Sequence, residues 1–252
     1  MAGERMPVYY LRRLTGARRT RRGNRHLARY LAWIAGAENA GSFLGLHHYT
    51  SHMSGVVASL SDDLATGRMW LFAIGLVSLL SFFLGAVVTT ILIRLARERR
   101  MTSEYALPLL IEAVLVAVFS AMGGGIAVWN MLAAVALLCF SMGLQNAVIT
   151  KLSDAVIRTT HVTGMVTDVG ILAGRWMYGK LRPEQKLRAD EVLSLRLLAS
   201  LIGLFFLGGV MGAVAYKNFG WIFLAPLAAL LVTLAVVPVI DDLKAAGERE
   251  AA

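Results

Sequence analysis

The chain has 252 residues, of which 57% are hydrophobic and 16% are charged, and its formal net charge is +9. Soluble domains are typically about 45–50% apolar and about 25% charged, so the composition excludes an ordinary soluble globular protein. The charged residues also lie between apolar stretches instead of within them, a pattern typical of polytopic membrane proteins.

The first 29 residues form a basic tail that holds nine arginines and one acidic residue, Glu4. In a membrane protein such segments stay on the cytoplasmic side and face anionic lipid. We therefore expect residues 1–29 to form a cytoplasmic tail whose partners are membrane lipids, with anionic lipid at the tail itself. The apolar stretch that follows is not closed by a cleavage site of the kind that ends a signal peptide.

Six apolar stretches approach or reach the length of about 20 residues that a helix needs to cross a bilayer. In chain order they are residues 30–46, 70–93, 105–129, 131–149, 197–216 and 219–240. Transmembrane strands would alternate apolar and polar residues, and these stretches do not. The sequence predicts an all-α polytopic membrane protein, with a transmembrane domain over residues 30–240 and a second cytoplasmic tail over residues 241–252.

Two more helices are expected to be short, and either re-entrant or broken. The first begins near Met53 and reaches the polar residues 61–63 within three turns, which makes it too short to span. The second begins near Val162 and carries Asp168 and Arg175.

The chain also repeats itself. Residues 36–40 (Gly-Ala-Glu-Asn-Ala) correspond to residues 143–147 (Gly-Leu-Gln-Asn-Ala), at an offset of 107. Residues 51–57 (Ser-His-Met-Ser-Gly-Val-Val) correspond to residues 160–166 (Thr-His-Val-Thr-Gly-Met-Val), at an offset of 109. The expected units are residues 30–129 and 130–240, each with a long helix, a short helix and two more long helices.

The distribution of lysine and arginine selects the topology. If neither short helix crosses the membrane, 23 of the 25 basic residues lie inside, and Arg68 and Lys217 lie outside. If both short helices cross, 18 lie inside and 7 outside, so the positive-inside rule favours six crossings with both termini in the cytoplasm. Three crossings per unit then place the second unit upside down, which is the inverted-repeat architecture of many transporters.

Three motifs resemble the YoaK family of bacterial inner-membrane proteins, which carry a domain of unknown function. These are residues 51–55, residues 143–147, and residues 158–164 (Arg-Thr-Thr-His-Val-Thr-Gly) followed by Thr167-Asp168. The likeness covers roughly residues 30–240. The family pattern usually continues the first motif with asparagine, where Val56 stands here, and often has aspartate in place of Glu38. The resemblance implies a multi-pass protein of the bacterial inner membrane, and it implies no particular substrate or reaction.

The two Ser/Thr-His-x-Ser/Thr-Gly segments are the best candidates for a site. A hydroxyl residue at a helix start caps free backbone N–H groups, and a glycine lets a ligand or another backbone approach closely. Two helix N-termini that point inward favour an anionic or strongly polar solute; the alternative is that these residues are only caps and packing contacts. The candidates are His52, Ser54, Gly55, Thr160, His161, Thr163 and Gly164.

Polar residues inside the apolar stretches are the remaining candidates for a substrate or ion pathway. Glu38 is either a proton or cation site or a structural hydrogen-bonding group between helices. Asn39 and its counterpart Asn146 are expected to pair across the two units, next to Gln145. Asp168 is a candidate coupling site and Glu112 a secondary one. Arg175 either pairs with Asp168 or reaches the cytoplasmic interface.

No cofactor or metal is expected. His47, His48 and His52 are close in sequence, but the spacing of five between His47 and His52 is not helical, and no cysteine or carboxylate completes a ligand set. Walker, dinucleotide and nucleophile-elbow motifs are absent from the sequence, so we expect no enzyme.

The sequence therefore favours a secondary transporter or channel for a polar small molecule, either anionic or neutral. The alternative is a membrane interaction or regulatory protein that transports nothing and acts through its basic N-terminal tail; a membrane enzyme is a third hypothesis. The sequence is also compatible with a homo-oligomer.

Overall fold

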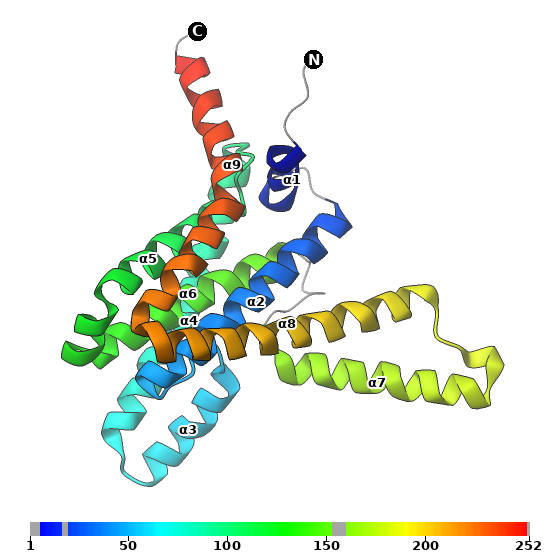
Figure 1. The fold of residues 1–252 in the computed structure, drawn as a ribbon, viewed down its shortest axis with the longest axis horizontal. Coiled ribbons are helices and arrows are strands. Elements are labelled where there is room, and N and C mark those ends of the chain that lie inside the picture. The colour runs from blue at the N-terminus through cyan, green and yellow to red at the C-terminus, as the bar shows by residue number, and fades with distance from the viewer. Residues whose placement is uncertain (1–5, 17–19, 153–159, 251–252) are drawn as a thin grey trace.

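The structure, a computed structural model, describes residues 6–16, 20–152 and 160–250, and these residues form helices with no strand among them (Figure 1). The predicted all-α fold is thus confirmed. The elements are α1 (Met6–Thr15), α2 (Arg21–Leu46), α3 (Met53–Ala65), α4 (Met69–Glu98), α5 (Ala106–Trp129), α6 (Met131–Leu152), α7 (Val162–Leu181), η1 (Pro183–Gln185), α8 (Ala189–Phe219), η2 (Gly220–Phe223) and α9 (Leu224–Glu250).

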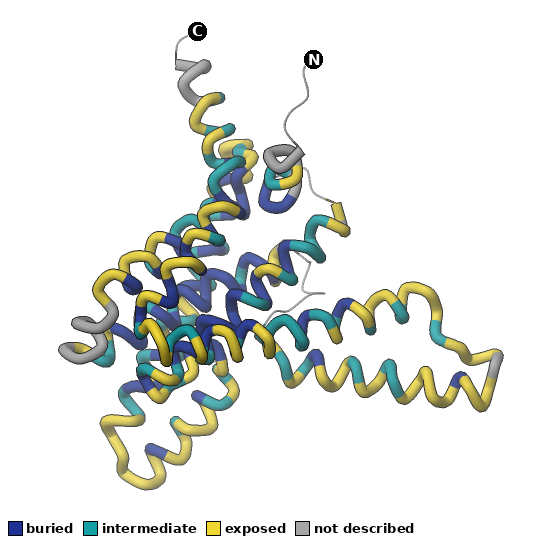
Figure 2. Tube along the Cα trace, viewed as in Figure 1, coloured by how far each residue is buried: buried dark blue, intermediate teal, exposed yellow. Residues whose placement is uncertain are grey.

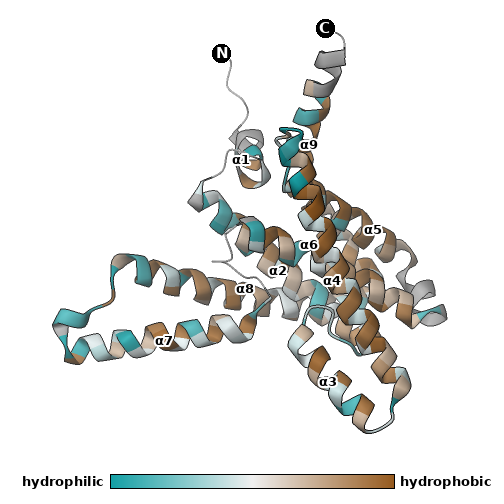
Figure 3. Ribbon diagram, turned by 180° about the vertical axis from the view of Figure 1, so that it is seen from behind, coloured by the Kyte–Doolittle hydropathy of each residue, from teal (hydrophilic) through white to brown (hydrophobic). Residues whose placement is uncertain are grey.

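Three stretches of the described residues are long and apolar enough to cross a membrane: Met69–Glu98, Met131–Lys151 and Ala189–Ala245. The last has 57 residues and contains α8, η2 and most of α9. The chain turns within it at Gly220, whose φ of 56° is readily adopted only by glycine. The hydrophobic residues of these helices are seen from behind in Figure 3. Their length and hydropathy mark the chain as a membrane protein.

The two helices that were expected to be short differ in length. α3 has 13 residues, about 20 Å, and is confirmed as too short to cross a bilayer. α7 has 20 residues, about 30 Å, so the expectation of a short second helix was wrong. Asp168 and Arg175 do not break α7 because both occupy exposed positions while the helix packs against α8.

α2 and α8 cross in close contact because a glycine stands on each helix at the crossing. A Cβ atom at Gly36 would clash with the carbonyl oxygen of Phe205, and a Cβ atom at Gly208 would clash with that of Trp33. The backbones therefore touch directly, as they do at small-residue contacts between membrane helices.

α4 and α6 cross in the same way and at corresponding positions. A Cβ atom at Gly143 would clash with the carbonyl oxygen of Phe82, and one at Gly85 would clash with that of Phe140. The two contact residues on α6, Phe140 and Gly143, lie 107 positions after Trp33 and Gly36 on α2. The two on α4, Phe82 and Gly85, lie 123 positions before Phe205 and Gly208 on α8. The two crossings are therefore built from equivalent residues of the two halves of the chain.

The contacts also define the directions of these helices. From its crossing point α2 continues to Gly45, which lies against the Tyr216 side chain of α8. α4 continues to Thr89, whose hydroxyl donates a 3.2 Å hydrogen bond to the Leu144 carbonyl of α6. α2 and α8 therefore run in the same general direction, as do α4 and α6.

α5 and α9 run in opposite directions, and the contacts at their ends show it. Near the end of α5, Ser120 donates to the carbonyl oxygen of Trp221, just before α9 begins. At the other end, the Asp242 carboxylate of α9 accepts hydrogen bonds from the backbone N–H groups of Thr102 and Ser103, each at 2.8 Å. The α4–α5 connection thus lies at the same end of the molecule as both chain termini (Figure 1).

The core lies where these helices meet (Figure 2). It consists of buried apolar side chains contributed mainly by α2, α5, α6 and α9. The hairpins formed by α3 with the start of α4, and by α7 with the start of α8, extend away from it and are mostly exposed (Figure 2). The largest fully buried side chains include Tyr105, Phe119, Leu31, Leu109, Leu138 and Met142.

Candidate functional site

A single cavity of about 870 Å³ is lined by the starts of both α3 and α7. The two histidine motifs, which are 109 residues apart in the sequence, therefore face one space. α4 and α8 supply apolar wall residues, among them the equivalent pair Phe82 and Phe205. The predicted site residues that line the cavity are Asn39, His52, Ser54, Thr160, His161, Thr163 and Gly164.

His52 and His161 occupy the N-cap positions of α3 and α7. The hydroxyl residues Ser54 and Thr163 were expected to cap these helices, but each is the second residue of its helix, so that expectation was wrong. The free backbone N–H groups of both first turns thus lie beside the cavity, and the positive ends of two helix dipoles meet there. This arrangement attracts a negatively charged group.

Gly55 makes room for the His52 ring. A Cβ atom at Gly55 would clash with the imidazole, so only glycine lets the ring fold over the first turn of α3. On its other side the ring meets Tyr49 edge to face, with centroids 6.4 Å apart. Tyr49 in turn stacks on Phe43 at 4.2 Å. Sequence analysis missed Tyr49 because its position after the end of α2 follows no helical period.

Asn39 holds the segment between α2 and α3 in place. Its side-chain carbonyl accepts hydrogen bonds from the backbone N–H groups of Thr50 and Ser51, each at 3.1 Å, and from the Ser51 hydroxyl at 3.0 Å. In the second half, the equivalent Asn146 accepts a hydrogen bond from the Thr160 hydroxyl. The expected pairing of the two asparagines is wrong, because each binds the loop of its own half.

Glu38 and Gln145 lie outside the cavity, in the core behind it. Both are fully buried, as is Glu112 of α5. Gln145 donates a 2.8 Å hydrogen bond from its side-chain nitrogen to Glu112. Sequence analysis gave Glu112 little weight, although a carboxylate inside an apolar helix was the signal that pointed to it.

Asp168 is exposed on α7, and it is not among the described residues that line the cavity. Arg175, which was considered as its partner, instead pairs with Glu191 of α8. The spacing of seven residues puts Asp168 and Arg175 on one face of α7, but the Arg175 guanidinium pairs with the Glu191 carboxylate of α8 instead. Arg158 and Thr159 of the second motif lie outside the described residues.

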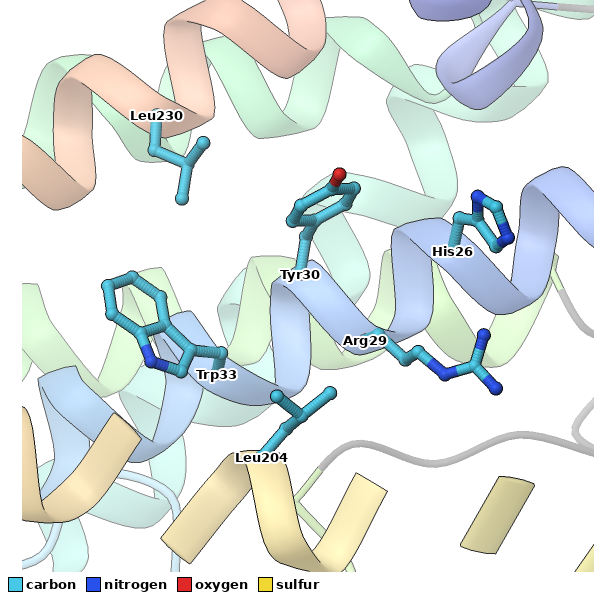
Figure 4. A pocket seen from close by; sticks show the side chains of 6 residues that line it. All are labelled: His26, Arg29, Tyr30, Trp33, Leu204 and Leu230. Carbon is cyan, nitrogen blue, oxygen red and sulfur yellow. The ribbon is translucent and has the colours of Figure 1, made fainter. Parts of the chain in front are cut away.

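A second pocket of about 480 Å³ lies between α2, α8 and α9, on the side of the N-terminal tail (Figure 4). Its lining combines two basic side chains with aromatic and aliphatic ones: His26, Arg29, Tyr30, Trp33, Leu204 and Leu230. His26 is bonded to the Tyr10 hydroxyl of α1 at 2.9 Å. Burial, together with the positive charges of Arg29 and Arg22, lowers the pKa of His26 below its ordinary value.

No curated protein and no solved structure matches this chain. One family model matches residues 27–237, and its description is "Protein of unknown function (DUF1275)". The match includes both histidine motifs, both glycine crossings and the buried carboxylates. The chain therefore belongs to the DUF1275 family.

Proposed function

We propose that this protein is a secondary transporter or channel, and not an enzyme, and that it carries a small anionic solute across the bacterial inner membrane. The observation that carries the proposal is that the N-termini of α3 and α7, each headed by a histidine, line one cavity. Its volume of about 870 Å³ is in the range of small-molecule sites. Positive helix ends bind the charge of the solute, and the phenylalanines of the wall exclude water around it.

An inverted repeat is part of this proposal. The equivalent glycine crossings of α2 with α8 and of α4 with α6 support two related halves. The helix directions support inversion, since α2 and α8 run together and α4 and α6 run together, as six crossings with internal termini require. In Figure 1 the α3–α4 connection lies at the bottom and the α5–α6 connection at the lower left, both away from α1 and the end of α9 at the top. The histidine motif of the second half further supports the likeness to the YoaK proteins.

The transport proposal is tested in proteoliposomes with a panel of radiolabelled small anions. His52→Ala and His161→Ala are each expected to lower the uptake rate about tenfold or more, because each removes a polar contact to a charged solute worth at least about 1.4 kcal/mol. Asp168→Asn is the matched control, since it changes an exposed polar residue outside the cavity lining. Folded wild-type protein that is inert across the panel, or histidine variants that are as active as wild type, would contradict the proposal.

The topology is tested by labelling single cysteines from outside intact cells. Lys151 and Lys217 are both exposed and stand near the ends of spanning helices. Lys217→Cys is expected to react with a reagent that cannot cross the membrane, and Lys151→Cys only after the cells are broken. The lone native cysteine, Cys139, is buried and serves as the unreactive background. External labelling of Lys151→Cys would refute the inverted arrangement.

The second pocket, with its basic and apolar lining, favours anionic lipid as a partner. It also supports the alternative function, a regulatory protein that acts through its N-terminal tail. Basic pockets between membrane helices on the cytoplasmic side bind acidic head groups. Arg29 is held there by a 3.1 Å hydrogen bond to Ser200 of α8, while Trp33 and Leu230 offer apolar surface to a lipid chain. Removal of residues 1–20 separates the two functions: transport persists, whereas a docking function is lost.

A further inference from the structure

Two carboxylates from different helices are buried in the core. Glu38 of α2 and Glu112 of α5 are both fully buried on helices that pack against α6, and Glu112 lies within electrostatic range of Glu38. We propose that this pair holds one exchangeable proton, and that binding and release of this proton couple solute movement to the proton gradient. The inference rests on the proposed transport function and adds to it the identity of the coupling ion.

The hydrogen bonding of the pair is incomplete in a way that a proton would correct. Among the described residues, neither carboxylate oxygen of Glu38 has a hydrogen-bond partner, and Oε2 of Glu112 has none either. Oε1 of Glu112 accepts from the Gln145 amide nitrogen, while the Gln145 oxygen is also unpartnered. A proton bound to either glutamate turns one of these unpartnered oxygens into a hydroxyl group and removes one of the two negative charges.

Electrostatics require that the pair be at least partly neutralised. Burying an anion inside a protein is costly unless it is paired, and neither Glu38 nor Glu112 makes an ion pair among the described residues. One bound proton takes the pair from −2 to −1, because a buried carboxylate near a second one favours the neutral form. The Gln145 N–H donor at Glu112 is compatible with a proton there and would repel a metal cation.

Polar groups lie between the core that holds the pair and the loop that lines the cavity. His48 of that loop lies 2.8 Å from the Ser78 hydroxyl of α4, measured from Nε2. Ser78 donates to the carbonyl oxygen of Ile74, so the hydroxyl oxygen is left to accept from His48. Cys139 of α6 lies near both Ser78 and Glu38.

The other helices around the pair add no further charge. The ionisable groups next to it are Cys139 on α6 and, through Ser78, His48. In the described parts of α8 and α9, the buried positions carry no ionisable side chain. The two glutamates therefore set the charge of the pair, and Cys139 and His48 are the other ionisable groups near it.

The proton is tested directly by infrared spectroscopy of the protein in lipid nanodiscs. We expect an absorption band of a protonated carboxylic acid at neutral pH in the wild type. The band should shift or weaken in Glu38→Gln and in Glu112→Gln, and it should vanish in the double variant. Glu98→Gln, at the exposed end of α4, is the matched control and should leave the band unchanged. Absence of the band in wild type, or its persistence in the double variant, overturns the proposal.

Coupling is tested by a second measurement, in which solute exchange without a gradient is compared with accumulation driven by a pH gradient. Glu112→Gln should retain exchange and lose accumulation, and Ser78→Ala should slow accumulation. Accumulation that survives in both glutamate variants, or that follows a sodium gradient, overturns the coupling role. If no solute is moved at all while the infrared band behaves as expected, the transport function fails and the shared proton stands.

Discussion

At the scale of single residues, one asparagine determines the shape of the cavity. The carbonyl of Asn39 accepts three hydrogen bonds from Thr50 and Ser51, and these place His52 at the start of α3. Thr50 and Ser51 are buried, so their N–H groups have no easy access to water. A buried donor without a partner costs about 1–3 kcal/mol. The side chain of Asn39 is therefore a structural support for the site.

Asn39→Ala is expected to lower the free energy of unfolding by about 2–4 kcal/mol, because two buried backbone donors lose their acceptor. Reversible unfolding in mixed micelles measures the change. Asn218→Ala is the control: Asn218 is exposed and bonds only within its own helix, so its loss should change stability by less than about 0.5 kcal/mol. Equal effects of the two substitutions would show that Asn39 is not a support.

At the scale of helices, the close crossings decide how the two halves fit together. Gly208 of α8 lies against the Trp33 carbonyl, whereas a Cβ atom at Gly203 of the same helix would meet nothing within 4 Å. The same helix thus holds one glycine that packing requires and one that it does not. Comparing substitutions at Gly208 and Gly203 therefore separates two contributions to stability, the direct contact between backbones and the helix propensity of the residue.

Gly208→Ala is expected to destabilise the protein by about 1–3 kcal/mol, because the added methyl group forces the two backbones apart. Gly203→Ala should be neutral or stabilising by up to about 1 kcal/mol, since alanine is the better helix former. Thermal unfolding of both variants in detergent compares them. A stable Gly208→Ala protein with unchanged transport would contradict the direct contact of α2 with α8.

At the scale of the whole molecule, Asp242 ties the C-terminal helix to the α4–α5 connection. Burial raises the pKa of Asp242, but the hydrogen bonds from Ser103 and Thr102 together lower it by more. The pKa of Asp242 therefore lies below the ordinary value of 3.8. The ionised carboxylate therefore stabilises the folded state above the ordinary pKa. That stabilisation is lost as the pH falls through the lower, folded-state pKa.

Asp242→Asn should consequently flatten the acid side of the stability profile. We expect the Tm of the wild type to fall as the pH drops from about 6 to about 3, and the Tm of the variant to fall less. Asp62→Asn removes an exposed carboxylate of α3 and is the control. Profiles of wild type and Asp242→Asn that remain parallel would show that this clamp does not contribute.

The sequence by itself determined the helices and the membrane class, because hydropathy and charge act locally and are read along the chain. It also identified the two histidine motifs, since polar residues that recur inside apolar segments are informative without any knowledge of packing. It overestimated the effect of Asp168 and Arg175, which α7 accommodates on exposed positions.

Only the tertiary structure decided which polar residues share an environment. Glu38 and Asn39 are neighbours in the chain, yet they point about 100° apart around α2. Glu38 is therefore buried in the core, within electrostatic range of Glu112, and Asn39 binds the loop that lines the cavity. The partner of each is set by where α5 and the loop pack against α2, and such long-range packing leaves no mark in local hydropathy.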